Sequence, residues 1–307
     1  MNKFFTFLFS IITVAFFACN DSNNKTSEEV NIDTIQESVE LSDSLEAPDT
    51  LAPVDGIKRV FYDLASPVEL TEFILYSKST FNPNILNSTI NTTKYSTNIK
   101  QALNMGVYGT DLIYCRMYNQ KQDAIKYLSI IKTFTQELGI PKSDISNTLG
   151  SAENFIEKKD SLYILIRKAY SDADKYLNKN DRDNIASLIY FGAWTESLYI
   201  ATNMYKEPEV DKKVIGLHIA QQKFAINNLL KLLGNTVDSP DITHYAILVK
   251  KLKKIYDGID IVIDRKKSKI DTLTKTIIIN EDKTVVTPEQ IEEISNAVRR
   301  IRADITG

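Results

Sequence analysis

Two carboxylates stand in stretches of sequence that otherwise carry no charge, and they are the clearest candidates for chemistry. Glu196 is the sole charged residue between positions 185 and 204, and Asp111 is the sole one between positions 102 and 115. Tyr114 follows Asp111, while Trp194 and Tyr199 flank Glu196. Burying a bare carboxylate costs several kcal/mol, so each must be paired, hydrogen-bonded or protonated. These five residues are the candidate ligand-binding or buried polar residues.

Two interpretations of the carboxylates stay open. In the structural one, each accepts a hydrogen bond from a tyrosine, from an arginine such as Arg116 or Arg167, or from a helix N-terminus. In the functional one, Glu196 is a polar anchor inside a ligand cavity between helices. A ferritin-like di-metal site needs Glu-x-x-His on two facing helices, and the sequence contains no Glu-x-x-His.

Other groups that commonly carry catalysis stand alone or are missing. Neither His218 nor His244 has a second histidine or a cysteine at metal-ligand spacing. Cys115 lies in an apolar setting, which favours a small buried residue over a nucleophile. The sequence has no P-loop, no Gly-x-Ser-x-Gly and no His-Glu-x-x-His. We therefore expect no enzyme activity, no catalytic residue and no metal site.

The first residues have the layout of a secretory signal. Lys3 gives the start a positive charge, an uncharged apolar run of about 14 residues covers 4–17, and Ala18 and Cys19 follow. A membrane-spanning helix needs about 20 residues, so the shorter run fits a signal peptide at 1–18. The segment resembles a bacterial lipoprotein signal, which is cut between a small residue and a cysteine that receives lipid.

This resemblance implies cleavage between Ala18 and Cys19 and attachment of lipid to the Cys19 thiol, the one covalent group expected. Two or three acyl chains make a stable membrane anchor. Asn20 follows the cysteine where an aspartate would favour the inner membrane, so we expect the outer membrane of the cell envelope, with its periplasmic or surface face left open. The alternatives are an ordinary secretory signal with a chance cysteine and an uncleaved membrane anchor.

Residues 19–56 change character. Between positions 20 and 56, ten Asp and Glu residues stand against one basic residue, Lys25, which gives a charge of −9. Low hydrophobicity and charge of one sign predict a disordered acidic tether. A docking segment that folds on a partner is the alternative. Removing this −9 and the +1 of the signal from the net charge of −3 leaves +5 on residues 57–307. So small a positive charge does not indicate a nucleic-acid partner.

Apolar residues at spacings of three and four predict that 57–307 form a multi-helix antiparallel bundle of the all-α class. The run 185–204 is apolar on all sides, which favours a central helix over its rival, a membrane span. Residues 276–279 and 284–286 read as a small C-terminal β-hairpin at about 274–287. The expected helices cover 66–77, 99–117, 124–138, 160–177, 182–205, 212–233, 240–263 and 288–303.

Two further patterns concern the helices. Thr-(Asp/Glu)-x-(Leu/Ile)-Tyr occurs at 110–114 and at 195–199, each time after a glycine and before a helix that ends in Leu-Gly. This favours two related helical hairpins, with chance similarity as the alternative. Basic residues gather at 250–254, at 265–269 and at Arg299, Arg300 and Arg302. We interpret them as solvated faces, with anionic lipid, glycan or the tether as alternative contacts.

The segments Gly-Val-Tyr-Gly-Thr-Asp-Leu at 106–112 and Gly-Ala-Trp-Thr-Glu-Ser-Leu-Tyr at 192–199 carry a wider resemblance. With the signal and the acidic spacer, they make the chain similar, over roughly residues 57–265, to a family of helical lipoproteins of Gram-negative bacteria without an assigned activity. The resemblance implies only the fold and the location.

We expect a lipid-anchored, non-enzymatic interaction protein of the envelope, an accessory subunit whose partner is an envelope protein. The alternative is a receptor lipoprotein that binds a small molecule or glycan in a cavity near Glu196.

Overall fold

The computed structural model describes residues 74, 77–141, 159–234, 240–261, 269–271, 276–278 and 286–307, without the side chains of 159–167, 170 and the two strands. All of these residues belong to one unit, Leu51–Gly307. The expected signal peptide at 1–18, the expected tether at 19–56 and most of the helix expected at 66–77 lie outside the described residues.

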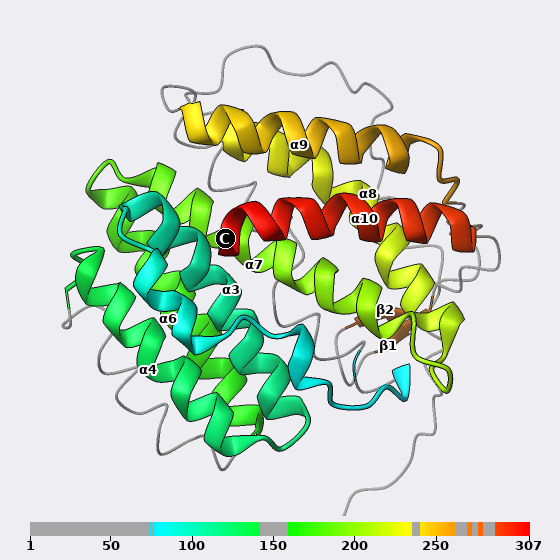
Figure 1. The fold of residues 1–307 in the computed structure, drawn as a ribbon, viewed down its shortest axis with the longest axis horizontal. Coiled ribbons are helices and arrows are strands. Elements are labelled where there is room, and N and C mark those ends of the chain that lie inside the picture. Colours follow the sequence, from blue (N-terminus) through cyan, green and yellow to red (C-terminus); the bar gives the residue numbers. More distant parts are fainter. Residues whose placement is uncertain are drawn as a thin grey trace, which may run out of the picture. The chain divides into compact units, whose positions relative to one another are not determined.

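Helices make up most of the described chain, which confirms the all-α class (Figure 1). Two short 3-10 helices come first, and a two-stranded ladder precedes the last helix. The elements are η3 (Pro83–Ile85), η4 (Thr89–Lys94), α3 (Asn98–Met117), α4 (Lys121–Glu137), α6 (Lys159–Lys179), α7 (Asp183–Met204), α8 (Lys212–Gly234), α9 (Pro240–Asp257), β1 (Lys269–Asp271), β2 (Thr276–Ile278) and α10 (Pro288–Thr306).

Local signals explain where several helices begin and end. The Thr97 side chain accepts from the Lys100 N–H and caps α3. Gly139 follows α4 with a φ of 65°, the left-handed conformation that suits glycine after a helix. The predicted capping box of α10 is confirmed, because the side chains of Thr287 and Gln290 each bond to the other's backbone N–H.

Helix α9 ends earlier than the sequence predicted. It stops at Asp257 instead of about residue 263. The N–H groups of Gly258 and Ile259 turn back to the carbonyls of Ile255 and Tyr256, which closes the helix in a tighter turn. This turn brings Ile259 into the core, where it is fully buried.

The C-terminal β-hairpin expected at about 274–287 is not supported. Residues Thr276–Ile278 pair with the preceding segment Lys269–Asp271, antiparallel, with Ile270 opposite Ile277. Val286 is not in a strand, and residues 284 and 285 lie outside the described part. An isoleucine-rich run indicates a strand but does not identify the segment with which it pairs. The predicted partner, 284–286, is therefore wrong, and the observed partner is Lys269–Asp271.

Three helix pairs are antiparallel, as contacts between their residues show. Gln101 at the start of α3 bonds to Glu137 at the end of α4. Trp194 in the middle of α7 donates to Gln222 in the middle of α8, and the two residues lie equally far from the connection between these helices. Gln290 at the start of α10 reaches Gly258 just after α9. The pairs α3–α4 and α7–α8 are therefore helical hairpins that meet where α3 packs on α7 (Figure 1).

The contact between α3 and α7 depends on two glycines. A Cβ placed on Gly106 would overlap the carbonyl oxygen of Ile189, and one placed on Gly192 would overlap the carbonyl oxygen of Leu103. The Thr110 hydroxyl bonds across the contact to the Ala193 carbonyl at 3.2 Å. Backbone thus lies against backbone, and every residue of α3 from 101 to 117 is buried.

Within the described residues, no helix is both long and apolar enough to cross a membrane. The apolar run 185–204, for which a membrane span was the rival interpretation, forms helix α7. This helix is buried along most of its length by α3, α6, α8 and α10.

We predict that Gly106→Ala or Gly192→Ala separates α3 from α7 and lowers the free energy of unfolding by roughly 3 kcal/mol or more, at or beyond the upper end for overpacking. Gly234→Ala is the matched control, because nothing lies within 4 Å of its added Cβ; it should be neutral or stabilising by up to about 1 kcal/mol. Urea denaturation followed by circular dichroism measures all three. Equal stabilities would contradict the close approach.

Candidate functional site

Glu196 on α7 forms a buried ion pair with Arg302 on α10. Its side chain is 0% exposed. Arg302 donates from Nε to Glu196 Oε2 at 2.7 Å and from Nη2 to Oε1 at 2.9 Å. Both carboxylate oxygens therefore bind one guanidinium, which is the strongest common geometry for this pair.

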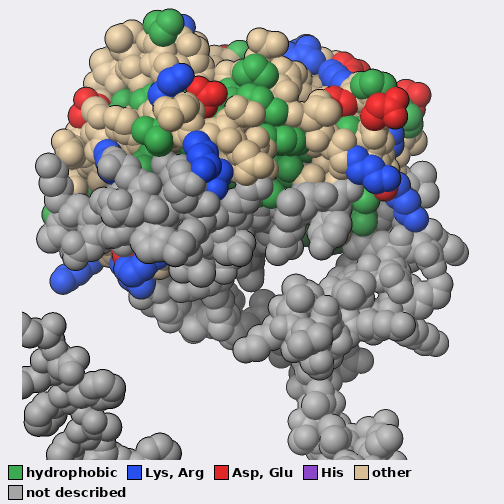
Figure 2. All heavy atoms as spheres, turned by 90° about the horizontal axis from the view of Figure 1, so that it is seen from below, with side chains coloured by type: hydrophobic (Ala, Val, Ile, Leu, Met, Phe, Trp, Pro, Cys, Tyr) green, Lys and Arg blue, Asp and Glu red, His purple; other side chains and the backbone are tan. Residues whose placement is uncertain are grey.

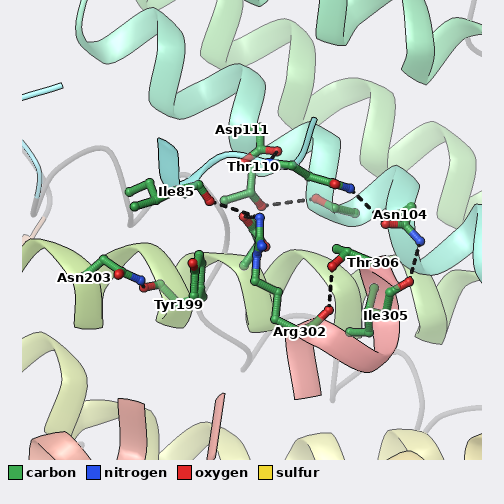
Figure 3. Close-up of polar contacts among 12 residues, drawn as sticks. Ile85, Asn104, Thr110, Asp111, Tyr199, Asn203, Arg302, Ile305 and Thr306 are labelled. Atoms are coloured by element: carbon green, nitrogen blue, oxygen red, sulfur yellow. Dashed lines mark hydrogen bonds and ion pairs between the residues drawn. The ribbon is translucent and has the colours of Figure 1, made fainter. Parts of the chain in front are cut away.

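Arg302 has further partners that hold its side chain in place (Figure 3). Its Nη2 also donates to the Ile85 carbonyl at 3.0 Å, and its guanidinium lies 4.2 Å from the centre of the Tyr199 ring. Burial alone would lower the pKa of Arg302, but the Glu196 carboxylate and then Asp111 outweigh burial and raise it. Arg302 is therefore cationic whenever the protein is folded.

Asp111 lies beside this pair and is also 0% exposed. Its Oδ2 accepts from the Asn87 N–H at 3.0 Å, whereas its buried Oδ1 has no hydrogen-bond partner among the described residues. Burial, and then the Glu196 carboxylate, raise the pKa of Asp111 well above its ordinary value, against the lowering effects of Arg302 and the Asn87 N–H. Two acids thus share one arginine, and a proton on Asp111 makes the group neutral.

A polar network continues from Asp111 to the end of the chain. The Asn87 side chain donates to Tyr95 Oη at 3.1 Å and to Asn104 Oδ1 at 3.2 Å. Tyr95 and Asn104 in turn donate to the carbonyls of Thr306 and Ile305, at 3.1 and 2.9 Å. The last carbonyls of α10, which no later residue of the helix can bond, are satisfied in this way.

We call the residues Asp111, Glu196, Tyr199 and Arg302 the buried charge cluster. Three of the five predicted residues, Asp111, Glu196 and Tyr199, are in it. The other two point elsewhere: the Tyr114 hydroxyl accepts from the Asn82 N–H at 3.0 Å, and Trp194 Nε1 donates to Gln222 on α8 at 2.9 Å. They tie other parts of the chain to α3 and α7.

The prediction that Arg116 pairs with a buried carboxylate is wrong. The prediction for Arg167 is not tested. Arg116 is 1% exposed, yet its Nε and Nη1 have no acceptor, and the Arg167 side chain is not described. The true partner of Glu196 is Arg302, which the sequence predicts to lie on a solvated face. The spacing of residues in this helix could have indicated that Arg302 faces the core. Ser295, Val298 and Ile305 lie on the same face of α10 as Arg302, and all three are buried.

The remaining reactive side chains do not join the cluster. His244 Nε2 lies 2.9 Å from Asp304 Oδ2 at the surface. Asp241 stands three residues before His244 in the sequence, but the carboxylate that His244 contacts is that of Asp304. Burial lowers the pKa of His218 to about 4. Burial also raises the pKa of the fully buried Cys115 thiol. Among the residues that the structure describes, no group of three His, Cys, Asp or Glu could hold a metal ion.

We predict that Arg302→Met lowers the free energy of unfolding by about 3–5 kcal/mol, because it leaves the two buried carboxyls without a cation. The exposed Arg300 on the same helix is the matched control, and Arg300→Met should change stability by no more than about 0.5 kcal/mol.

Asp111→Asn should be tolerated to within about 1 kcal/mol, because an amide is a neutral group of the same shape as the protonated acid and its oxygen can still accept from the Asn87 N–H. Urea denaturation at pH 7 measures these variants. A loss for Asp111→Asn as large as that for Arg302→Met would mean that Asp111 is ionised.

Comparison of the chain with protein-family models, with curated proteins and with solved structures finds no match in any of the three.

Proposed function

We propose that the protein is a lipid-anchored interaction protein of the cell envelope, without enzyme activity, that serves as an accessory subunit of an envelope complex. Support for the location comes from the sequence. The apolar run at 4–17, the small residue Ala18 and Cys19 fit a lipoprotein signal. The acidic segment that follows suits a spacer between a lipid and a helical domain.

One observation carries the choice of an interaction protein over a receptor or an enzyme. Both oxygens of Glu196 bind Arg302, and Glu196 has no exposed surface. A ligand in a cavity near Glu196 would find its proposed polar anchor already occupied. The Glu196 carboxylate therefore stabilises the fold. We infer that a partner binds at the surface of the domain.

The surface of the described residues is mixed. Figure 2 shows one face, on whose described part hydrophobic, basic and acidic side chains are interspersed. Four large hydrophobic side chains are exposed, each on a different element. They are Ile90 on η4, Ile125 on α4, Phe224 on α8 and Ile247 on α9. They are suitable positions from which to search for a partner.

We predict that cells grown with radiolabelled palmitate label the wild-type protein in the membrane fraction. The Cys19→Ser variant should stay unlabelled, because no thiol remains to receive the lipid. Cys115→Ser is the matched control and should be labelled as the wild type is. Label on the Cys19→Ser variant would contradict lipidation at this position.

The interaction itself is tested by photo-crosslinking in whole cells, with the crosslinking residue placed at each of the four exposed hydrophobic positions in turn. One protein crosslinked from one or two positions, and lost in the Cys19→Ser chain, is the expected result. A chain that stays monomeric from all four positions would contradict a protein partner on these surfaces.

A further inference from the structure

Arg116 on α3 is a second buried cation of the domain, separate from the buried charge cluster. The residue is 1% exposed. Its Nε and Nη1 atoms are buried and have no hydrogen-bond partner among the residues that the structure describes. An arginine side chain stays positively charged in proteins, and a buried charge without a counter-charge is strongly unfavourable. Arg116 therefore presents a positive charge and free donors that an anion would satisfy.

Arg116 points away from the buried charge cluster. Successive residues of an α-helix are turned by about 100°, so Arg116 is turned by about 140° from Asp111 on α3. On α7, Ser197 is turned by about 160° from Tyr199 by the same rule. Asp111 and Tyr199 both lie on the side of Arg302. Arg116 and Ser197 therefore lie together on the opposite side of the contact between α3 and α7.

Helix α6 covers that opposite side. Both α6 and α10 pack against α3 and α7, and α10 carries Arg302 on the side of the cluster. The Ser197 hydroxyl is also buried and has no hydrogen-bond partner among the described residues. A hydroxyl can donate to the same anion as a guanidinium. Two unpartnered groups of donors thus lie on the same side of one helix contact, beneath α6.

We propose that Arg116 and Ser197 bind a small oxoanion, a phosphate or a carboxylate, between α3, α6 and α7. The planar guanidinium matches the spacing of the oxygens in both kinds of anion. The anion is small and free in solution, because a residue that is only 1% exposed leaves no room for a group carried on a macromolecule. We call this the anion site. It goes beyond the proposed function, since it lies inside the domain and not on the surface that a protein partner would contact.

A bound anion should make the stability of the domain depend on anion concentration. A ligand that binds the folded chain and not the unfolded chain shifts the unfolding equilibrium by mass action. Above the dissociation constant, each tenfold rise in anion concentration should therefore lower the unfolding equilibrium constant by about tenfold.

Urea unfolding of the full chain, purified in a neutral detergent and followed by circular dichroism, tests the anion site. Sodium phosphate or sodium acetate is added in rising concentration, with sodium chloride keeping the ionic strength constant. We expect at least one of the two oxoanions to stabilise the wild type. Arg300→Met removes an exposed arginine and is the matched control, which should respond as the wild type does.

Arg116→Met distinguishes an anion site from an ion pair within the chain. Without an oxoanion, this variant should be at least as stable as the wild type, because it removes a buried charge, and it should not respond to either oxoanion. Ser197→Ala should bind the anion about tenfold more weakly, because a hydrogen bond to a charged group is lost. An Arg116→Met chain that is less stable than the wild type without an oxoanion overturns the site, because Arg116 would then already be paired within the chain.

Equilibrium dialysis of the wild type against radiolabelled phosphate or acetate gives a readout that does not depend on the variants folding. We expect saturable binding of one oxoanion per chain. No saturable binding of either oxoanion overturns the anion site, and so does a response to the oxoanion that is the same in Arg116→Met as in the wild type.

Discussion

The fold depends on one arginine that is paired with one buried acid and lies close enough to a second to affect its pKa. An uncompensated charge in a protein core costs more than most single packing contacts supply, so each neighbour of Arg302 is constrained. Glu196 must come from α7, Asp111 from α3, and the Ile85 carbonyl from the segment before α3. Four parts of the chain therefore have to be correctly placed at once, which ties the last helix to the first described segment.

The close approach of α3 and α7 is what makes the cluster compact. Asp111 stands five residues after Gly106, and Glu196 stands four residues after Gly192. With backbone against backbone at the two glycines, side chains one turn further along meet across the contact. The two similar sequence patterns at 110–114 and 195–199 are thus the two sides of one contact, whatever their ancestry.

Sequence reasoning predicted what depends on local pattern. Spacings of three and four located the described helices, the capping box at Thr287 located the start of α10, and lack of nearby charge identified Asp111 and Glu196 as buried. It failed where partners are far apart in the chain. Arg302 is separated from Glu196 by 106 positions, and the partner of Thr276–Ile278 is chosen by pairing and not by composition. Neither relation is encoded in a local period.

The distance along the chain between Arg302 and Glu196 has a consequence for the order of folding. Their ion pair joins residues 106 positions apart, and a contact between distant residues forms only after the chain has lost the entropy of the long loop between them. Until α10 docks, α3 and α7 can meet only as a pair of acids without their cation. The docking of α10 is therefore the step that lets the core between α3 and α7 close.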